Sequence, residues 1–365
     1  MTGGTQYPIR LEYYEATNSA SIQLNWTRPD GTIQVVPLEF LYPASSPASQ
    51  MPQDAATAPT GSTDPSPSEP TPPTSAEFGA RHVPRSKTPS SNDRFVSPTG
   101  SGTTCSQSNP CSLQEGVNRG GFIWLLNGTY NYNGQLSVGS GKTLEALYPK
   151  GATIDFQNSG SSRITLGSNN IIRNIIVRGA SQAGIMVFGN NNLLHGVISE
   201  YHRGSGFATW PDSGYSDTKN PNGGSYNNFT DSTGRFNNDC PTASCNDSGA
   251  DGISLSAGRG NRIVHFSAYG NSDDGIDLWA SYETVVQNSV AYDNGFTSTG
   301  IRIGNGMQYK MGCNIDYAWY CPVPNNNRIV NNWAYGRHVG YFSQNGGSGF
   351  AEISGNVCGA DRTPC

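Results

Sequence analysis

Short apolar alternations recur at a nearly constant spacing through the C-terminal part of the chain. Asn170-Ile-Ile returns 22 residues later as Asn192-Leu-Leu, and Asp251-Gly-Ile253 returns 23 residues later as Asp274-Gly-Ile276. Two more pairs share this spacing: Ala183-Gly-Ile185 with Ser205-Gly-Phe207, and Ala268-Tyr-Gly-Asn271 with Ala291-Tyr-Asp-Asn294. Such a period predicts a solenoid of short strands. Leucine-rich repeats have similar lengths, but their Leu-x-x-Leu-x-Leu framework is missing. We therefore predict an all-β, right-handed parallel β-helix with coils of about 22 residues.

The beginning of the repetitive region has the pattern of a capped solenoid. Cys111-Ser-Leu-Gln-Glu-Gly-Val-Asn118 predicts a short amphipathic helix that covers the first coil. Phe122-Ile-Trp-Leu-Leu126 predicts the first strand, and Asn127-Gly-Thr-Tyr130 predicts the turn after it. The period breaks at residues 208–249 and 296–326, where we expect long loops, which in a compact solenoid are commonly functional.

Three regions differ in their pattern. Residues 1–43 contain alternating strand segments, Ile22–Trp26 and Ile33–Pro37. Residues 44–92 are rich in Pro, Ser, Thr and Ala and hold ten of the 23 prolines, which predicts a disordered, extended linker. Residues 93–365 are rich in Gly, Asn and β-branched residues and form the predicted β-helix domain.

The charge of the chain excludes some classes of function. A net charge of −5 with 13% charged residues offers no basic stripe for nucleic acid. No run of 18 or more apolar residues predicts a membrane span. The chain opens with MTGGTQYPIR, which contains no apolar signal segment, so we expect that a signal was removed or that a longer protein precedes this sequence.

The eight cysteines form closely spaced pairs. Such pairs predict small disulfide loops and an extracellular, secreted protein. Zinc is the alternative, but no CxxC or HxxxH spacing supports it. The pairs are Cys105/Cys111, Cys240/Cys245, Cys313/Cys321 and Cys358/Cys365.

Carboxylates gather where two coils repeat. Stacking Gly252 on Gly275 places Asp251 on Asp274 at the ordinary strand spacing, with Asp273 and Asp277 on the same outer patch. Two such charges repel by about 3 kcal/mol at an effective dielectric of about 20. A cation removes this repulsion, and an all-oxygen site suits Ca²⁺. Solvated or backbone-capping aspartates, and a purely structural calcium, remain alternatives.

A lysine follows one coil later. The strand Gly304–Gly312 alternates so that Lys310 points outward. With Gly306 aligned on Gly275, Lys310 would lie one coil over and two residues along from Asp277, about 8 Å away. This gap leaves room for a sugar carboxylate between metal and amine. A merely solvated lysine is the alternative. The side chains expected to face inward are Met307, Tyr309 and Met311.

Together these segments resemble the family 9 polysaccharide lyases, calcium-dependent pectate lyases with a right-handed β-helix. The segments that carry the resemblance are Gly249–Ile253, Asn271–Leu278 and Gly304–Lys310. The resemblance covers about residues 92–365 and implies that Lys310 is the catalytic base. It also implies four calcium ligands, Asp251, Asp273, Asp274 and Asp277. The chain departs from the family in having fewer glycines just before the lysine, and it stops a coil or two beyond Lys310, so we expect a truncated C-terminus.

The first region resembles the closing strands of the protective-antigen-like sugar-binding β-sandwich. The matching segments are Tyr7–Glu15, Ser21–Trp26 and Leu38–Pro43. About 40 residues match, which is far short of a domain. We therefore expect a remnant of that domain.

The resemblance implies calcium-dependent β-elimination on polygalacturonate, or pectin, by a monomer. The base removes the C5 proton, and positive charge beside the C6 carboxylate offsets the charge that develops there. Arg302 and Arg337 are candidate clamps for substrate carboxylates.

Other functions stay open. A polygalacturonate hydrolase needs a pair of acidic groups flanking a water, and its family's Gly-His-Gly segment is absent. The Asp-Pro-His-Asp type of signature expected of an alginate epimerase or lyase is also missing. A non-catalytic sugar-binding or adhesion β-helix with structural calcium is the alternative from a different class.

Overall fold

The computed structural model describes most of the chain after residue 77 and two short strands before it. The described residues are 25–27, 33–35, 78–210, 223–239, 249–296, 300, 306–311, 324–337, 340–344 and 350–365. The chain divides into two compact units, Met1–Ala55 and Ala56–Cys365. In the first unit, β1 (Asn25–Thr27) and β2 (Ile33–Val35) pair antiparallel, within the region predicted to contain strands.

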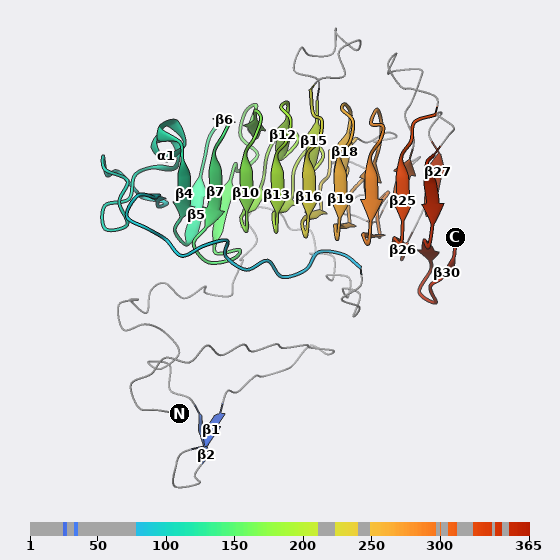
Figure 1. Cartoon of the computed structure of the whole chain (residues 1–365), viewed down its shortest axis with the longest axis horizontal. Coiled ribbons are helices and arrows are strands. Elements are labelled where there is room, and N and C mark those ends of the chain that lie inside the picture. Colours follow the sequence, from blue (N-terminus) through green and yellow to red (C-terminus); the bar gives the residue numbers. More distant parts are fainter. Residues whose placement is uncertain are drawn as a thin grey trace. The chain divides into compact units, whose positions relative to one another are not determined.

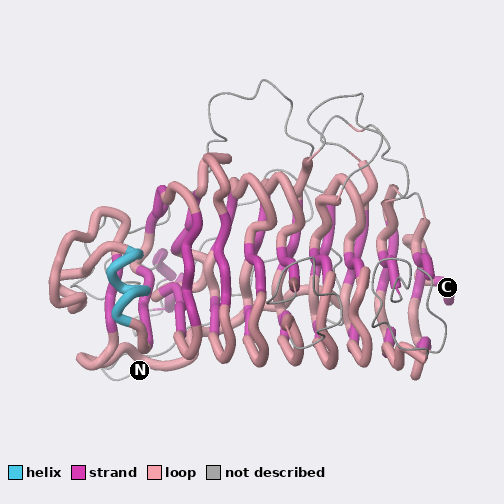
Figure 2. Tube along the Cα trace, turned by 90° about the horizontal axis from the view of Figure 1, so that it is seen from above, coloured by secondary structure: helices cyan, strands magenta, loops and turns pink. Residues whose placement is uncertain are grey.

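The second unit is a parallel β-helix whose strands stack into three sheets along one axis (Figures 1 and 2). The first sheet contains β28 (Glu352–Ser354), β25 (Arg328–Val330), β22 (Val285–Gln287), β19 (Arg262–Val264), β16 (Asn228–Thr230), β13 (Leu193–His195), β10 (Ile171–Arg173), β7 (Thr143–Ala146), β4 (Phe122–Leu125) and β3 (Arg94–Val96). The second contains β30 (Thr363–Pro364), β29 (Val357–Cys358), β26 (Trp333–Tyr335), β23 (Val290–Tyr292), β20 (Ser267–Tyr269), β17 (Thr233–Arg235), β14 (Ile198–Glu200), β11 (Ile176–Arg178), β8 (Ala152–Asp155) and β5 (Gly128–Asn131). The third contains β27 (Phe342–Gln344), β24 (Tyr309–Met311), β21 (Ile276–Asp277), β18 (Ile253–Leu255), β15 (Phe207–Thr209), β12 (Ile185–Val187), β9 (Arg163–Leu166) and β6 (Gln135–Gly139).

The sequence repeats set the register between coils. The predicted fold is confirmed, because strands of the same sheet from successive coils pair in parallel. The four repeats identified in the sequence pair as predicted: Ile171 with Leu193, Ile185 with Phe207, Ile253 with Ile276, and Ala268 with Ala291.

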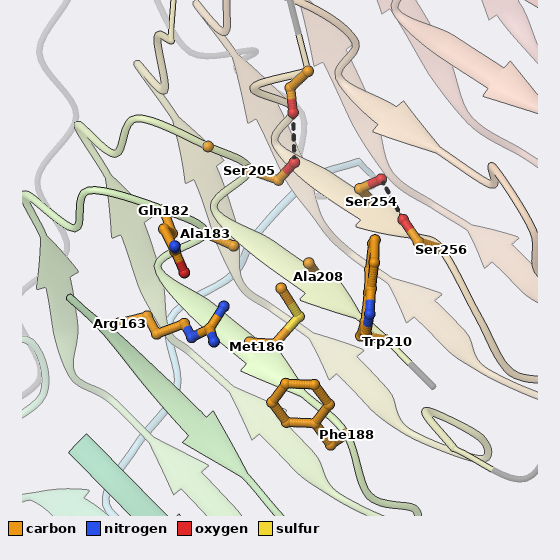
Figure 3. Close-up of a pocket in the computed structure, with 12 residues that line it drawn as sticks. Arg163, Gln182, Ala183, Met186, Phe188, Ser205, Ala208, Trp210, Ser254 and Ser256 are labelled. Carbon is orange, nitrogen blue, oxygen red and sulfur yellow. Dashed lines mark hydrogen bonds between the residues drawn. The ribbon is translucent and has the colours of Figure 1, made fainter. Parts of the chain in front are cut away.

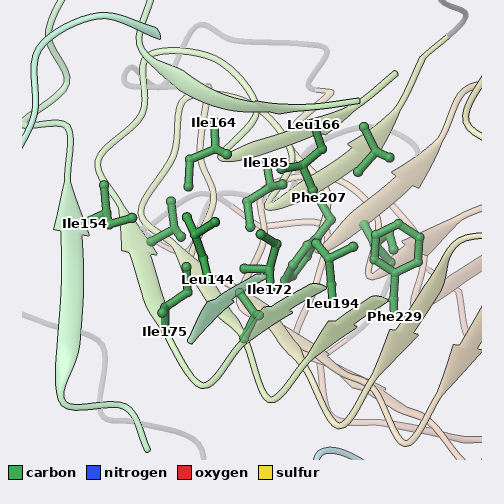
Figure 4. Packing of buried hydrophobic residues seen from close by; sticks show 14 of the residues in the cluster. Leu144, Ile154, Ile164, Leu166, Ile172, Ile175, Ile185, Leu194, Phe207 and Phe229 are labelled. Carbon is green, nitrogen blue, oxygen red and sulfur yellow. The ribbon is translucent and has the colours of Figure 1, made fainter. Parts of the chain in front are cut away.

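Stacked apolar side chains fill the interior of the coils. Every second residue of each short strand points inward, so equivalent positions of successive coils touch one another (Figure 4). Each fully buried aliphatic or aromatic side chain contributes about 1.5–3 kcal/mol. In the third sheet this row includes Ile164, Ile185, Phe207 and Ile253, each at most 1% exposed.

A ladder of buried amides marks the corner between the second and third sheets. The backbone N–H groups of Asn237, Asn271 and Asn294 donate to the side-chain oxygens of Asn271, Asn294 and Gln308, respectively. All four side chains are fully buried. At a corner the backbone leaves the strand ladder, so its N–H groups have no partner in a neighbouring strand. The side-chain amides accept hydrogen bonds from these groups, which would otherwise be buried without partners.

The predicted helix caps the N-terminal coil. Helix α1 (Leu113–Arg119) begins after Ser112, whose hydroxyl accepts a hydrogen bond from Glu115 N at 3.2 Å. Leu113 and Val117 pack into the core. Among the described residues no helix is long and apolar enough to cross a membrane.

Three predicted local features differ in the structure. The first strand of the β-helix is β3, not the segment at 122–126, which is β4 and pairs with it. The segment predicted as the next turn, 127–130, largely forms strand β5. The predicted loop at 208–249 contains the strands β16 and β17, which pair within the first and second sheets. The residues of this coil follow the preceding coil at a spacing longer than 22, so the repeat period did not predict it.

Residues 78–92, here called the strap, differ from the predicted disordered linker. The strap runs along the corner between the first and second sheets, from the C-terminal coils toward the N-terminal ones (Figure 1). Phe78 packs on Trp333, with ring centroids 5.9 Å apart, and Arg81 Nε lies 2.6 Å from Asp231 Oδ1. Further toward the N-terminal end, Ser86 N donates to buried Glu145 at 2.8 Å. These contacts offset the chain entropy that a Pro-rich segment loses on ordering. Residues 44–77 lie outside the described residues.

Two of the four predicted disulfides are confirmed. Cys105 and Cys111 are bonded, with Cα atoms 4.7 Å apart, and Cys358 and Cys365 are bonded, with Cα atoms 5.3 Å apart. The remaining two predicted pairs lie outside the described residues: Cys240/Cys245 and Cys313/Cys321.

Candidate active site

The outer surface of the third sheet brings the predicted site residues together. Strands β18, β21 and β24 lie side by side, and Ser254, Asp277 and Lys310 are opposite one another in the parallel register. Side chains alternate between the two faces of a strand, so these three point outward while Ile276 and Tyr309 fill the core.

The register of Lys310 differs from the predicted one by two residues. Ile276 pairs with Tyr309, which puts Gly275 beside Gln308 and not beside Gly306. The reason is the amide ladder, because the side chain of Gln308 accepts from Asn294 Nδ2 at 2.7 Å and closes the corner. Aligning Gly306 with Gly275 therefore predicted the wrong register, because in this coil a glutamine, Gln308, occupies the ladder position.

As a result, Lys310 touches the aspartates. Its Nζ lies 3.0 Å from Asp274 Oδ2 and 3.4 Å from Asp277 Oδ2, in place of the predicted separation of about 8 Å. The Nζ atom also lies 4.9 Å from the centroid of the Trp279 ring. The predicted inward direction is confirmed for Tyr309 and Met311 but not for Met307, which lies half-buried ahead of β24.

The four predicted aspartates form one buried cluster. Carboxylate oxygens of Asp251, Asp273 and Asp274 lie within 4.8 Å of one another. Lys310 contacts both Asp274 and Asp277, which connects Asp277 to the other three. None of the four side chains is more than 9% exposed. Backbone and hydroxyl donors orient part of the cluster: Asp274 N donates to Asp251 Oδ1 at 2.9 Å, and Ser205 Oγ donates to Asp251 Oδ2 at 3.0 Å.

Burial and mutual repulsion disfavour the charged form of these carboxylates. Burial, reinforced by Asp274, raises the pKa of Asp273 to about 9, and burial raises that of Asp277 to about 7 despite the nearby lysine. The pKa values of Asp251 and Asp274 are raised as well, first by burial. Burial lowers the pKa of Lys310, but the charges of the aspartates outweigh this and raise it.

The cluster fits a hard divalent cation. Asp277 Oδ1 is buried and has no hydrogen-bond donor among the described residues. No described residue donates a hydrogen bond to the carboxylate of Asp273. Buried carboxylate oxygens without donors, arranged on two adjacent coils, are the ligands that Ca²⁺ takes in its flexible oxygen coordination.

Two neighbours of the cluster, Asp239 and Trp279, were not among the predicted site residues. Asp239, after the ladder residue Asn237, raises the pKa of Asp273 through its charge, although burial and Asp274 contribute more. It lies in the stretch interpreted as a loop, so nothing in the period identified it. Trp279 could have been found, because it lies two residues beyond Asp277 in the same alternating segment.

Of the two candidate arginine clamps, only Arg337 is among the described residues, and no described contact joins it to the cluster. Arg302 lies outside the described residues. Arg337 is exposed, and its guanidinium lies 4.8 Å from the Phe296 ring centroid and 3.8 Å from Asp293 Oδ1.

Comparison with known proteins agrees with the fold. The Pel9A-like, right handed beta helix region family model matches residues 94–361, and the chain belongs to this family, which confirms the resemblance to family 9 lyases. A PA14 domain model matches residues 1–39. Pectate lyase L of Dickeya chrysanthemi is 28% identical over 292 residues, which cover 72% of this chain and 64% of that protein. Pectate lyase L of Paenibacillus polymyxa (strain SC2) is 30% identical over 216 residues, which cover 53% of this chain and 47% of that protein.

The fold also resembles that of a solved enzyme. The crystal structure of pectate lyase Pel9A superposes with a TM-score of 0.52 at 23% identity, covering 67% of this chain and 63% of that chain. The chain spans less than two thirds of the length of these pectate lyase L relatives.

Proposed function

We propose that this chain is a secreted, calcium-dependent pectate lyase that cleaves polygalacturonate by β-elimination. The observation that carries the proposal is the contact between one half-buried lysine and a cluster of four buried aspartates on the outer face of the third sheet. The similarity to pectate lyase L proteins supports the same reaction class.

The four aspartates would hold the calcium ion: Asp251, Asp273, Asp274 and Asp277. When bound there, calcium supplies positive charge beside the C6 carboxylate of the substrate, where negative charge develops. Lys310 then removes the C5 proton. The negative charge of the aspartates raises the pKa of Lys310, and neutralising that charge favours the uncharged amine that can accept a proton.

Several residues of the chain hold Lys310 in position. The parallel register fixes its backbone opposite Asp277, and Trp279 packs near its amine. After the C5 proton has moved to Lys310, the bond between C4 and its oxygen breaks, the leaving oxygen takes a proton from water, and a 4,5-unsaturated sugar remains.

The test uses the full chain with polygalacturonate, and it follows the ultraviolet absorbance of the unsaturated product with calcium or with a chelator. We expect absorbance growth only with calcium, and a loss of about 10²–10⁴-fold in rate for Lys310→Ala. Lys142→Ala, which removes a half-buried lysine from an N-terminal coil, is the matched control and should keep its activity.

Each of the other possible results would refute a specific part of the proposed function. Full activity of Lys310→Ala would refute its role as the base. New reducing ends without absorbance would indicate a hydrolase, and calcium-dependent binding of the polymer without turnover would indicate an adhesion module.

A further inference from the structure

A groove continues from the aspartate cluster along the outer face of the third sheet. It has a volume of about 740 Å³ and is lined by side chains of the coils that contain β9, β12, β15 and β18 (Figure 3). This volume is in the range of sites that bind small molecules or parts of larger ligands. The lining residues that matter here are Arg163, Gln182, Met186, Phe188, Trp210 and Ser254.

The register makes the groove and the cluster one continuous surface. In successive strands, Thr165, Met186, Ala208, Ser254 and Asp277 are opposite one another. Each coil adds about 4.8 Å, so the four steps between β9 and β21 separate the far end of the groove from the cluster by about 19 Å. A bound polymer long enough to pass the cluster therefore reaches the groove.

Arg163 gives the far end of the groove a positive charge. It is half-buried, and no described carboxylate lies within ion-pair distance of it. Its Nε donates only a 3.3 Å hydrogen bond to Gln135 Oε1, and its guanidinium lies 6.0 Å from the Phe188 ring centroid. Figure 3 shows the guanidinium over the groove near Gln182 and Met186. A cation that is partly desolvated and unpaired favours an anionic ligand.

Aromatic side chains form a parallel row two residues further along the strands, at the next outward-facing position. Trp210 N donates to Val187 O at 3.0 Å, which places Trp210 beside Phe188 in the neighbouring coil. Trp279 holds the corresponding position in the coil of Asp277. Flat aromatic rings match the apolar faces of sugar rings, while hydroxyl and amide groups on the groove can bind sugar hydroxyls.

We propose that this groove binds a second stretch of the same uronate polymer, several sugars away from the bond that is cleaved. Arg163 binds a uronate carboxylate there, and Phe188 and Trp210 pack against sugar rings. The inference rests on the proposed function for the identity of the polymer. Charge complementarity and the continuous row of opposite residues favour this occupant over an uncharged glycan. The enzyme should consequently favour long chains over short oligomers.

The test compares Arg163→Gln with the unaltered chain on polygalacturonate and on trigalacturonate. The charge-assisted hydrogen bond should be worth about ten- to a hundred-fold in kcat/KM on the polymer, with no change on the trimer. Met186→Glu, which places a carboxylate beside Arg163 on the groove floor, should give the same selective loss. Arg119→Gln, at an exposed position of α1, is the matched control.

Binding of polygalacturonate is measured alongside, so that the two proposals can fail separately. If the unaltered chain cleaves the polymer and both groove variants behave like it on both substrates, the groove proposal is overturned while the lyase proposal stands. If nothing is cleaved but Arg163→Gln and Met186→Glu weaken polymer binding, the groove proposal stands without the lyase. If the unaltered chain neither cleaves nor binds the polymer, both proposals are overturned.

Discussion

Replacing Asn271 by Ala tests whether the amide ladder holds the site in place. The side chain of Asn271 is fully buried at the corner that precedes β21, two residues before Asp273. Its Nδ2 donates to Gly234 O at 3.2 Å and to Asn294 Oδ1 at 2.8 Å. Its Oδ1 accepts from Asn237 N at 3.2 Å and from Asn237 Nδ2 at 2.9 Å. The substitution removes all four hydrogen bonds.

The cost follows from these contacts. A typical hydrogen bond contributes about 1 kcal/mol net, and a buried group left without a partner costs about 1–3 kcal/mol. The N–H of Asn237 and the carbonyl of Gly234 stay buried, so they lose partners that water cannot replace. We therefore expect Asn271→Ala to lower the free energy of unfolding by about 3–5 kcal/mol.

Chemical denaturation followed by tryptophan fluorescence measures this change, and calorimetric titration with Ca²⁺ measures its effect on the site. Calcium binding should weaken too, because the ladder fixes the backbone that carries Asp273 and Asp274. Asn118→Ala, at an exposed position of α1, is the control and should change stability by less than about 0.5 kcal/mol. A change below about 1 kcal/mol for Asn271→Ala would refute the argument that the ladder stabilises this corner.

Two further predictions concern charge. Asp277→Asn should weaken Ca²⁺ binding at least about tenfold in calorimetry, because it removes one of four carboxylate charges; unchanged affinity would place the ion elsewhere. Burial raises the pKa of Asp231, but hydrogen bonds from His195 and Arg81 outweigh this and lower it to about 2, below the ordinary 3.8. Its stabilising contribution is thus complete above about pH 4 and is lost as the pH falls toward about 2. Denaturation at about pH 5 and about pH 2 should show Asp231→Asn less stable than the unaltered chain only at the higher pH; a constant difference would contradict this origin.

The spacing of apolar residues was sufficient to predict the fold and most of the register. Asp251 and Asp274 repeat within identical short segments, so their stacking followed from the sequence. The position of Lys310 did not, because an amide from Gln308 replaces the expected glycine and shifts the strand by two residues. The strap was predicted to be disordered because its composition is rich in proline. Composition does not show that two of its apolar side chains, Phe78 and Val83, are buried against the coils and anchor it.

The strap has a consequence for how the solenoid comes apart. In a stack of coils, each repeat contacts only its neighbours, and the ends can fray while the middle stays folded. The strap instead ties distant coils through one covalent segment, from Trp333 through Asp231 to Glu145. Opening of the coil that contains Trp333 is thereby coupled to coils far from it. A single protease cut in the strap would turn one cooperative body into a stack whose ends open independently, with every coil residue unchanged.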